Sequence, residues 1–195
     1  QMSRVLAITG QVIPVTSANV QLEAVFENGV RVVGESKIYH VKKEQDCRIA
    51  HVALIPEHPA PLPAALAAIR EADLILLGPG SLYTSVIPNL LVDGVAQAIA
   101  QSDAPKIYVC NIMTQEGESE GYTAADHLEA LLAHGCPGLV DLCLANSTPM
   151  QPGLVEKYQA EGAAPLVIDR ERIAALGLEL VERPVAAHHG DFARH

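Results

Sequence analysis

The sequence predicts an α/β fold with a mostly parallel sheet, and three features lead to this prediction. From about residue 63 onward, short apolar runs typical of buried strands alternate with segments that carry apolar residues at helical spacing. The preceding part contains a turn sequence between two apolar runs, which is typical of an antiparallel hairpin. Hydrophobic residues make up 49% of the 195 residues, enough for a sizeable core. We therefore expect a parallel sheet with helices on both faces, preceded by a β-hairpin.

Residues 1–58 are expected to form a mixed β region. Strand-like segments occur at residues 11–16, 20–26, 30–33 and 48–55. The turn sequence Glu27-Asn28-Gly29 lies between the second and third of these segments. Asn-Gly between two apolar runs strongly favours a tight hairpin turn, so these two segments are expected to pair.

Residues 59–185 are expected to form successive strand and helix units. Strands are predicted at 74–77, 106–111, 139–145, 165–168 and 178–185. Helices are predicted at 63–72, 88–101, 123–135, 153–161 and 170–176. Pro63 suits a first helical turn, and Thr123 with Asp126 has the form of a capping box. Residues 186–195 are interpreted as a C-terminal tail.

Composition narrows the classes of partner. The formal net charge of −10 argues against nucleic acid or an anionic membrane surface as the main partner. The four cysteines, Cys47, Cys110, Cys136 and Cys143, form no C-x-x-C pair, and we expect them to be reduced in a cytoplasmic protein. No metal site is predicted from their spacing.

Polar loops follow three of the predicted strands, at residues 78–87, 111–122 and 146–149. The carboxyl ends of parallel strands meet at one edge of a sheet, where α/β proteins bind their ligands. The candidate ligand-binding residues are Gly78, Gly80, Ser81, Tyr83, Thr84, Ser85, Asn89, Asn111, Thr114 and Gln115. The amides and hydroxyls of the second loop are suited to contact a sugar or the edge of a base.

The first loop, GPGSLYTS from Gly78 to Ser85, allows two interpretations. Glycine permits close approach of a ligand, and the N-terminus of the following helix offers unpaired N–H groups, which together suit a phosphate or diphosphate. The same residues also suit an ordinary tight turn with a Ser or Thr cap. The loop matches neither the Walker A motif nor G-x-G-x-x-G.

Candidates for catalytic groups are Asp126 and His127 at the start of the helix at 123–135. Either side chain can serve as a general base or contact a metal. The alternative is structural, with Asp126 as a cap partner and His127 in the core. Of the three carboxylates in the second loop, Glu116 and Glu120 are expected to be solvated.

At these loops the sequence resembles the gluconeogenesis factor family of bacteria, relatives of 2-phospho-L-lactate transferase. The matching stretches are GQVIPVT (10–16), ADLILLGPGSLYTSVIPNLLVDGV (72–95), KIYVCNIMTQEGESEGY (106–122) and ADHLEALLAHG (125–135). The resemblance implies a Rossmann-like domain that binds a nucleotide or nucleotide-sugar, typically a UDP-sugar. It also implies a regulator that links carbon metabolism to cell-wall synthesis and cell shape.

The resemblance leaves a second function open. The transferase relatives move a phospholactyl group from a guanylyl diphosphate donor onto a deazaflavin alcohol, and a divalent metal is a cofactor to expect only in that case. The sequence of the first loop is closer to the gluconeogenesis factors than to the G-P-S-N-P typical of the transferases. We therefore expect a non-catalytic regulator.

Members of this family begin with a glycine-rich G-G-G-T-G turn and a D-D-G-G-S-S-G segment, and this sequence has neither. We therefore expect the chain to correspond to the C-terminal portion of a larger domain whose first glycine-rich βα unit is missing here. A parallel sheet without those units exposes an edge and an apolar face. This surface is expected to be covered by the missing N-terminal half or by a second copy, and the chain to form a homo-oligomer.

Overall fold

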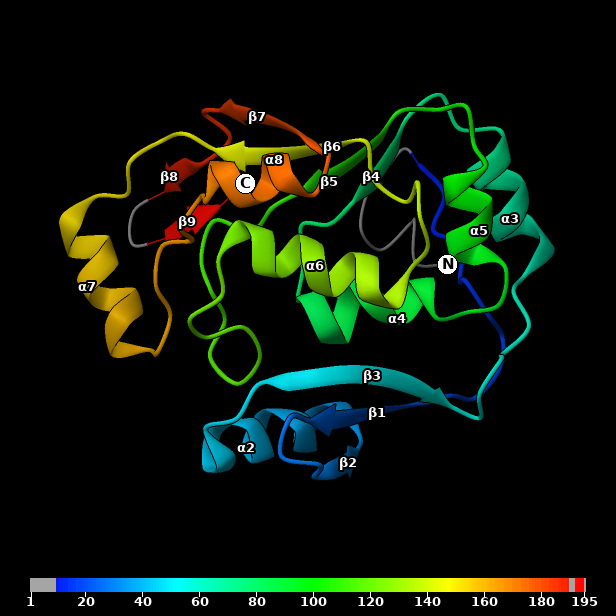
Figure 1. The fold of residues 1–195 in the computed structure, drawn as a ribbon, viewed down its shortest axis with the longest axis horizontal. Helices are drawn as coiled ribbons and strands as arrows, with labels where there is room; N and C mark the ends of the chain where they lie inside the picture. Colours follow the sequence, from blue (N-terminus) through cyan, green and yellow to red (C-terminus); the bar gives the residue numbers. More distant parts are fainter. Residues whose placement is uncertain (1–9, 190–191, 195) are drawn as a thin grey trace.

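The computed structural model describes residues 10–189 and 192–194, which are arranged in three layers (Figure 1). A parallel sheet and an antiparallel sheet lie on opposite sides of a layer of helices. The hydrophobic core fills the space between these layers and includes Phe26, Ile87, Tyr108, Leu128 and Leu131. The middle layer is therefore packed against a sheet on each side.

The antiparallel sheet contains the predicted hairpin. Its strands are β1 (Gln21–Phe26), β2 (Arg31–Val33) and β3 (Ile49–Ile55), in the order β2-β1-β3. Gly29 lies in the turn with φ 84°, a conformation that glycine adopts without strain. A helix that the sequence analysis does not predict, α2 (Glu35–Gln45), follows β2. Its segment is strongly polar, and Ile38 is its only fully buried apolar residue, so the periodic apolar signal of a helix is weak.

The parallel sheet confirms the α/β class. Its strands are β4 (Ile75–Leu77), β5 (Lys106–Val109), β6 (Leu142–Asn146) and β7 (Glu179–Arg183). They are hydrogen-bonded in this order, and each pair is parallel. Buried positions alternate along β4 and β6, for example Ile75 and Leu77 in β4. This alternation directs one face of the sheet toward the helices.

A continuous layer of helices covers that face. Its members are α3 (Pro63–Arg70), α4 (Ile87–Leu90), α5 (Val95–Ala100), α6 (Ala124–His134) and α8 (Arg170–Ala175). Helix α5 contacts α3 and α4, helix α6 contacts α4 and α8, and both α4 and α6 also contact β3. From β4 to β7, each connection leads to the adjacent strand, and always toward the same edge of the sheet. Right-handed crossovers therefore place their helices on the same side of the sheet.

The opposite face of the parallel sheet is open within the described residues. Leu76 of β4 is 55% exposed and Leu74, just before it, is 48% exposed. On the same face, Leu76 pairs with Ile107, which in turn pairs with Leu142, and both partners are only half-buried. The helices expected on this second face are not found in residues 10–189. An apolar face and the free edge of β4 are left exposed, as the sequence analysis expects.

Several predicted elements differ in detail. The helix predicted at 88–101 is divided into α4 and α5, because Gly94 adopts a left-handed conformation with φ 74° between them. It is preceded by one π-helical turn, η1 (Leu82–Val86). Segments 11–16 and 165–168 form only isolated bridges instead of strands. At the C-terminus, α7 (Pro152–Ala160) precedes α8, and the segment predicted as a tail contains β8 (Ala187–His189) and β9 (Phe192–Arg194), which pair.

Candidate ligand-binding site

The loops after β4 and β5 meet at the carboxyl edge of the parallel sheet. The Gly80 N–H donates to Asn111 Oδ1 at 3.2 Å, and Asn111 Nδ2 donates to the Gly80 carbonyl at 2.9 Å. The Ser81 hydroxyl donates to Gln115 Oε1 at 2.7 Å. The structure thus brings together four of the predicted ligand-binding residues, which are 31 to 34 positions apart across the two loops.

The first turn of η1 is occupied by a carboxylate from the second loop. Glu118 Oε2 accepts a hydrogen bond from the Leu82 N–H at 2.9 Å, and its Oε1 accepts from the N–H groups of Tyr83 and Thr84 at 3.1 and 2.9 Å. Glu118 is only 2% exposed. The sequence predicts that the N–H groups offered to a phosphate belong to a helix beginning near Pro88. The structure begins the helical segment earlier, at η1, and the first N–H groups of η1 bind the Glu118 carboxylate.

Burial and hydrogen bonding shift the pKa of Glu118 in opposite directions. Burial raises the pKa of this carboxyl above its ordinary value, and hydrogen bonds from the Thr84 side chain and the three N–H groups partly offset the increase. No pattern in the sequence singles out Glu118 from its neighbours Glu116 and Glu120. The alignment of its carboxylate with η1 depends on contacts between segments more than 30 residues apart.

The other predicted residues of the first loop have mainly structural contacts. Tyr83 is 2% exposed, and its hydroxyl lies 2.9 Å from that of Tyr122 and 3.3 Å from the Ile49 carbonyl. Ser85 and Asn89 are exposed, and Asn89 Nδ2 donates to the Ser85 carbonyl at 2.7 Å. Gly78 has φ 79°, and a Cβ there would lie 3.0 Å from the Val109 carbonyl oxygen, so the close approach of the two strands requires glycine.

Thr114 fastens the second loop to the segment before α8. Its N–H donates to the Ala164 carbonyl at 2.8 Å, and its hydroxyl accepts from the Ala164 N–H at 2.9 Å. Its side chain is also buried. In this structure Thr114 therefore holds the loop in position and offers no free group to a ligand.

The second loop is also anchored to α2. Lys43 Nζ lies 2.8 Å from Glu116, and the Tyr39 hydroxyl donates to the same carboxylate at 2.6 Å. Lys42 Nζ lies 3.1 Å from Glu120 Oε2. Glu116 and Glu120 are therefore partly exposed, as expected, but they are also ion-paired, because the unpredicted helix α2 supplies their cationic partners.

Asp126 forms the predicted capping box. Its carboxylate accepts from the Thr123 N–H at 2.8 Å, and its own N–H donates to the Thr123 hydroxyl at 3.3 Å. Arg172 donates to Asp126 Oδ1 at 2.9 Å, and Arg48 lies 3.8 Å from the same atom. Burial alone would raise the pKa of Asp126, but the Thr123 N–H and the Arg172 guanidinium outweigh it and lower the pKa. The carboxylate is fully engaged at the helix start.

His127 is completely buried in the helix layer. Its Nδ1 lies 3.0 Å from the Thr123 carbonyl oxygen, its ring packs edge-on against Tyr122, and burial lowers its pKa. Its Nε2 is buried and has no hydrogen-bond partner among the described residues. An imidazole without exposed surface has no route to a ligand here, which supports the structural interpretation of this histidine.

A cavity of about 350 Å³ lies at the carboxyl ends of β5, β6 and β7. Its polar lining includes Asn111, Ser147, Thr148, Arg170 and Glu182. The Thr148 hydroxyl oxygen is buried and has no partner within the described chain. Arg170 donates two hydrogen bonds to Glu182, at 2.7 and 2.8 Å. The loop at 146–149 can be identified from the sequence as a polar segment at a strand end. Thr148 and Arg170 are not among the candidate residues, because a single residue at a strand end has no distinguishing pattern.

Comparison with known proteins places these observations in a family context. The profile of the family described as "2-phospho-L-lactate transferase CofD" matches residues 1–186. The chain is 43% identical over 195 residues to the gluconeogenesis factor of Halalkalibacterium halodurans, and 45% identical over 196 residues to that of Bacillus subtilis. Both matches cover the whole chain but only 59% and 60% of those proteins. The chain therefore spans about three fifths of these relatives.

A solved structure shows the same relationship. The crystal structure of a UPF0052 family member from Bacillus halodurans superposes with a TM-score of 0.92 at 43% identity, covering the whole chain and 62% of that protein. Within the described residues, no helix has the length and apolar character needed to cross a membrane.

Proposed function

The chain belongs to the 2-phospho-L-lactate transferase CofD family, and on this premise we propose that it takes part in binding a nucleotide-sugar as a non-catalytic, cytoplasmic regulator. Its similarity to proteins named gluconeogenesis factor supports a role that connects carbon metabolism with cell-wall synthesis and cell shape. The ligand class we propose is a UDP-sugar, as the family resemblance implies.

The observation that carries this proposal is the cavity at the carboxyl ends of β5–β7. Ligands of α/β proteins bind at this edge of the sheet. The cavity combines a buried hydroxyl without a partner at Thr148, a second hydroxyl at Ser147 and the guanidinium of Arg170, whose Nε and Nη2 bond Glu182 and whose Nη1 has no partner among the described residues. A guanidinium and hydroxyl donors are groups that recognise a diphosphate. Asn111 connects this cavity to the Gly80–Ser81 loop.

The main alternative is a transferase that uses a guanylyl diphosphate donor. It requires a general base or a metal contact near the ligand. Both candidates identified from the sequence are engaged elsewhere: Asp126 caps α6 and pairs with Arg172, and His127 is buried. This arrangement supports the regulator over the enzyme.

Calorimetric titration with UDP-N-acetylglucosamine and with GDP tests the proposal. The 195-residue chain and the full-length Bacillus subtilis relative are titrated in parallel. We expect the UDP-sugar to bind the relative without turnover, and replacement of the residues equivalent to Thr148 by Val and Arg170 by Ala to weaken binding about tenfold each. Replacement of the residue equivalent to Arg70 by Ala in the same relative is the matched control, because Arg70 is exposed and lies outside the cavity. A preference for GDP with product formation would favour the transferase.

We also propose that the open face of the parallel sheet is an interface. About two fifths of the length of these relatives lies outside the matched region, and the uncovered apolar face and free edge of the sheet form a natural docking surface for that part. In the isolated 195-residue chain a second copy takes its place. Size-exclusion chromatography with light scattering is expected to show self-association that Leu76→Lys reduces; a monomer at all concentrations would contradict this proposal.

A further inference from the structure

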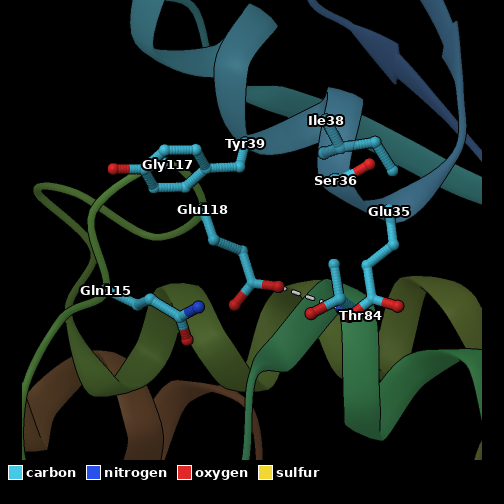
Figure 2. Close-up of a pocket in the computed structure, with 8 residues that line it drawn as sticks. All are labelled: Glu35, Ser36, Ile38, Tyr39, Thr84, Gln115, Gly117 and Glu118. Atoms are coloured by element: carbon cyan, nitrogen blue, oxygen red, sulfur yellow. Dashed lines mark hydrogen bonds between the residues drawn. The ribbon is translucent and has the colours of Figure 1, made fainter.

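A second cavity, of about 460 Å³, lies between α2 and the first turn of η1. It is lined by residues of the second loop at 115–118, whereas the cavity of the proposed nucleotide site involves the beginning of the same loop at 111–112. Figure 2 shows the side chains of Glu118, Thr84, Gln115 and Glu35 directed toward the same space beneath α2. Thr84 and Gln115 of this lining are among the candidate ligand-binding residues, but neither lines the cavity of the proposed nucleotide site.

The base of the cavity is rigid and polar. Glu118, 2% exposed, holds three N–H groups of η1 there, and Thr84 lies beside it. Gln115 accepts a hydrogen bond from Ser81 through Oε1, and its amide nitrogen has no partner within the described residues. This nitrogen is therefore available to donate to a ligand.

The upper wall of the cavity comes from the first turns of α2. Glu35 and Ser36 are exposed, and neither side chain has a hydrogen bond or ion pair to another described residue. Tyr39 adds exposed aromatic surface beside them, and the fully buried Ile38 lies behind this wall. A pocket with apolar walls and a few unengaged polar groups from separate elements is the usual form of a small-molecule site.

The charge of the lining selects the class of ligand. Two carboxylates, Glu35 and Glu118, line the cavity, and no Lys or Arg does. Lys37, the lysine nearest to Glu35 and Ser36 in sequence, is exposed and does not line the cavity, and Lys42 and Lys43 further along α2 are paired with Glu120 and Glu116. A phosphate or other anion would therefore meet two carboxylates and no cation in the lining, which is unfavourable.

We propose that this cavity binds an uncharged sugar. Sugar hydroxyls donate to the Glu35 carboxylate and accept from the amide of Gln115, and Ser36 can do either. The apolar face of the ring packs on the exposed ring of Tyr39. Because the lining comes from α2 on one side and from η1 and the second loop on the other, a sugar bound here connects the antiparallel part of the molecule with the parallel part.

The test is saturation-transfer NMR on the 195-residue chain with glucose and N-acetylglucosamine as neutral probes and glucose 6-phosphate as the anionic probe. No nucleotide is present, so the result is independent of the proposed function. Glu35→Gln is expected to weaken binding about fivefold, the effect of one charged hydrogen bond at an accessible site. Glu44→Gln is the matched control, because Glu44 is an exposed glutamate on the same helix outside the cavity.

Ser36→Trp provides a second variant that fills the cavity from an exposed position without altering the core. Saturable signals from a neutral sugar that are lost in Ser36→Trp, weakened in Glu35→Gln and unchanged in Glu44→Gln would support the proposal. Three results would overturn it: no saturable signal from either neutral sugar, signals that persist in Ser36→Trp, or binding of glucose 6-phosphate as tight as that of glucose. Far-UV circular dichroism confirms that each variant is folded.

Discussion

The starts of η1 and α6 are both held by a carboxylate, but the two carboxylates come from very different distances along the chain. At α6, Asp126 bonds the N–H of Thr123, three residues before it. At η1, Glu118 bonds three N–H groups that lie 34 to 36 residues before it. A helix start with the geometry of an anion-binding site can therefore already be occupied by a carboxylate side chain of the same protein.

The difference also changes what each carboxylate stabilises. The capping box at α6 satisfies two backbone N–H groups, those of Thr123 and Asp126, with side chains of the same helix start. It would therefore form in any packing of that helix. The Glu118 contacts connect the loops after β4 and β5, so they depend on the parallel sheet and contribute to it. Removing Glu118 therefore disturbs more of the molecule than removing part of the capping box.

The largest expected effect is that of Glu118→Ala. Three N–H groups lose their acceptor, two of them on the buried residues Leu82 and Tyr83, and we expect the free energy of unfolding to fall by about 3 kcal/mol. Urea denaturation measures this. Glu118→Gln keeps the shape and one acceptor oxygen, so its expected loss is smaller, about 1–2 kcal/mol. Equal and negligible losses in both variants would show that water replaces the carboxylate without cost.

A smaller effect is expected for Gly117→Ala, next to Glu118. Gly117 has φ 76°, and a Cβ there would lie 2.0 Å from the Tyr39 ring, so alanine strains the backbone and displaces the contact with α2. The backbone conformation alone costs about 1–2 kcal/mol. Urea denaturation gives the loss in stability, and hydrogen exchange shows whether protection decreases around residues 115–120. Gly153→Ala is the control: Gly153 lies in α7 with open space around it and without a positive φ, so alanine is expected to lower neither stability nor protection.

Thr123→Ala tests the local cap at α6. The substitution removes the hydroxyl that accepts from the Asp126 N–H, and caps of this kind contribute about 1 kcal/mol. The same denaturation experiment should therefore show a smaller loss than for Glu118→Ala. A loss as large as that of Glu118→Ala would contradict the distinction between a local and a long-range cap.

The smallest expected effect is a difference in pH dependence, and its sign differs between the two carboxylates. The lowered pKa of Asp126 contributes stability that is present above the ordinary aspartate pKa and is lost as the pH falls through the folded-state pKa. The raised pKa of Glu118 has the opposite consequence: stability decreases as the pH rises from the ordinary glutamate pKa through the folded-state pKa. Stability curves of Asp126→Asn and Glu118→Gln against pH should therefore depart from the unmodified chain in opposite directions. Departures in the same direction would show that one pKa shift has been assigned the wrong sign.

Much of the fold can be predicted from the sequence because the signals are local. The hairpin around Gly29, the helix beginning at Pro63 and the capping box at Thr123 each depend on residues within a few positions of one another. The helix α2 is missed because its only fully buried apolar residue is Ile38. The break between α4 and α5 is missed because an isolated glycine such as Gly94 is compatible with a continuous helix pattern.

The candidate site is predicted less completely. The meeting of the Gly80–Ser81 loop with Asn111 and Gln115 follows from the rule that parallel strands end at one edge, and the structure shows these contacts. The use of the η1 N–H groups by Glu118 does not follow from any rule of spacing. Thr148 and Arg170 likewise become candidates only when three strands and two loops place them around one cavity.

The α/β class, the order of most elements, the family resemblance and the loops that meet at the sheet edge can be inferred from the sequence, because each rests on local pattern or on the order of strands. The carboxylate at the start of η1, the partners of Glu116 and Glu120 and the open face that carries Leu76 are set by the three-dimensional packing. These features arise from contacts between distant segments. Such contacts form only after the chain has packed, so no short stretch of sequence encodes them.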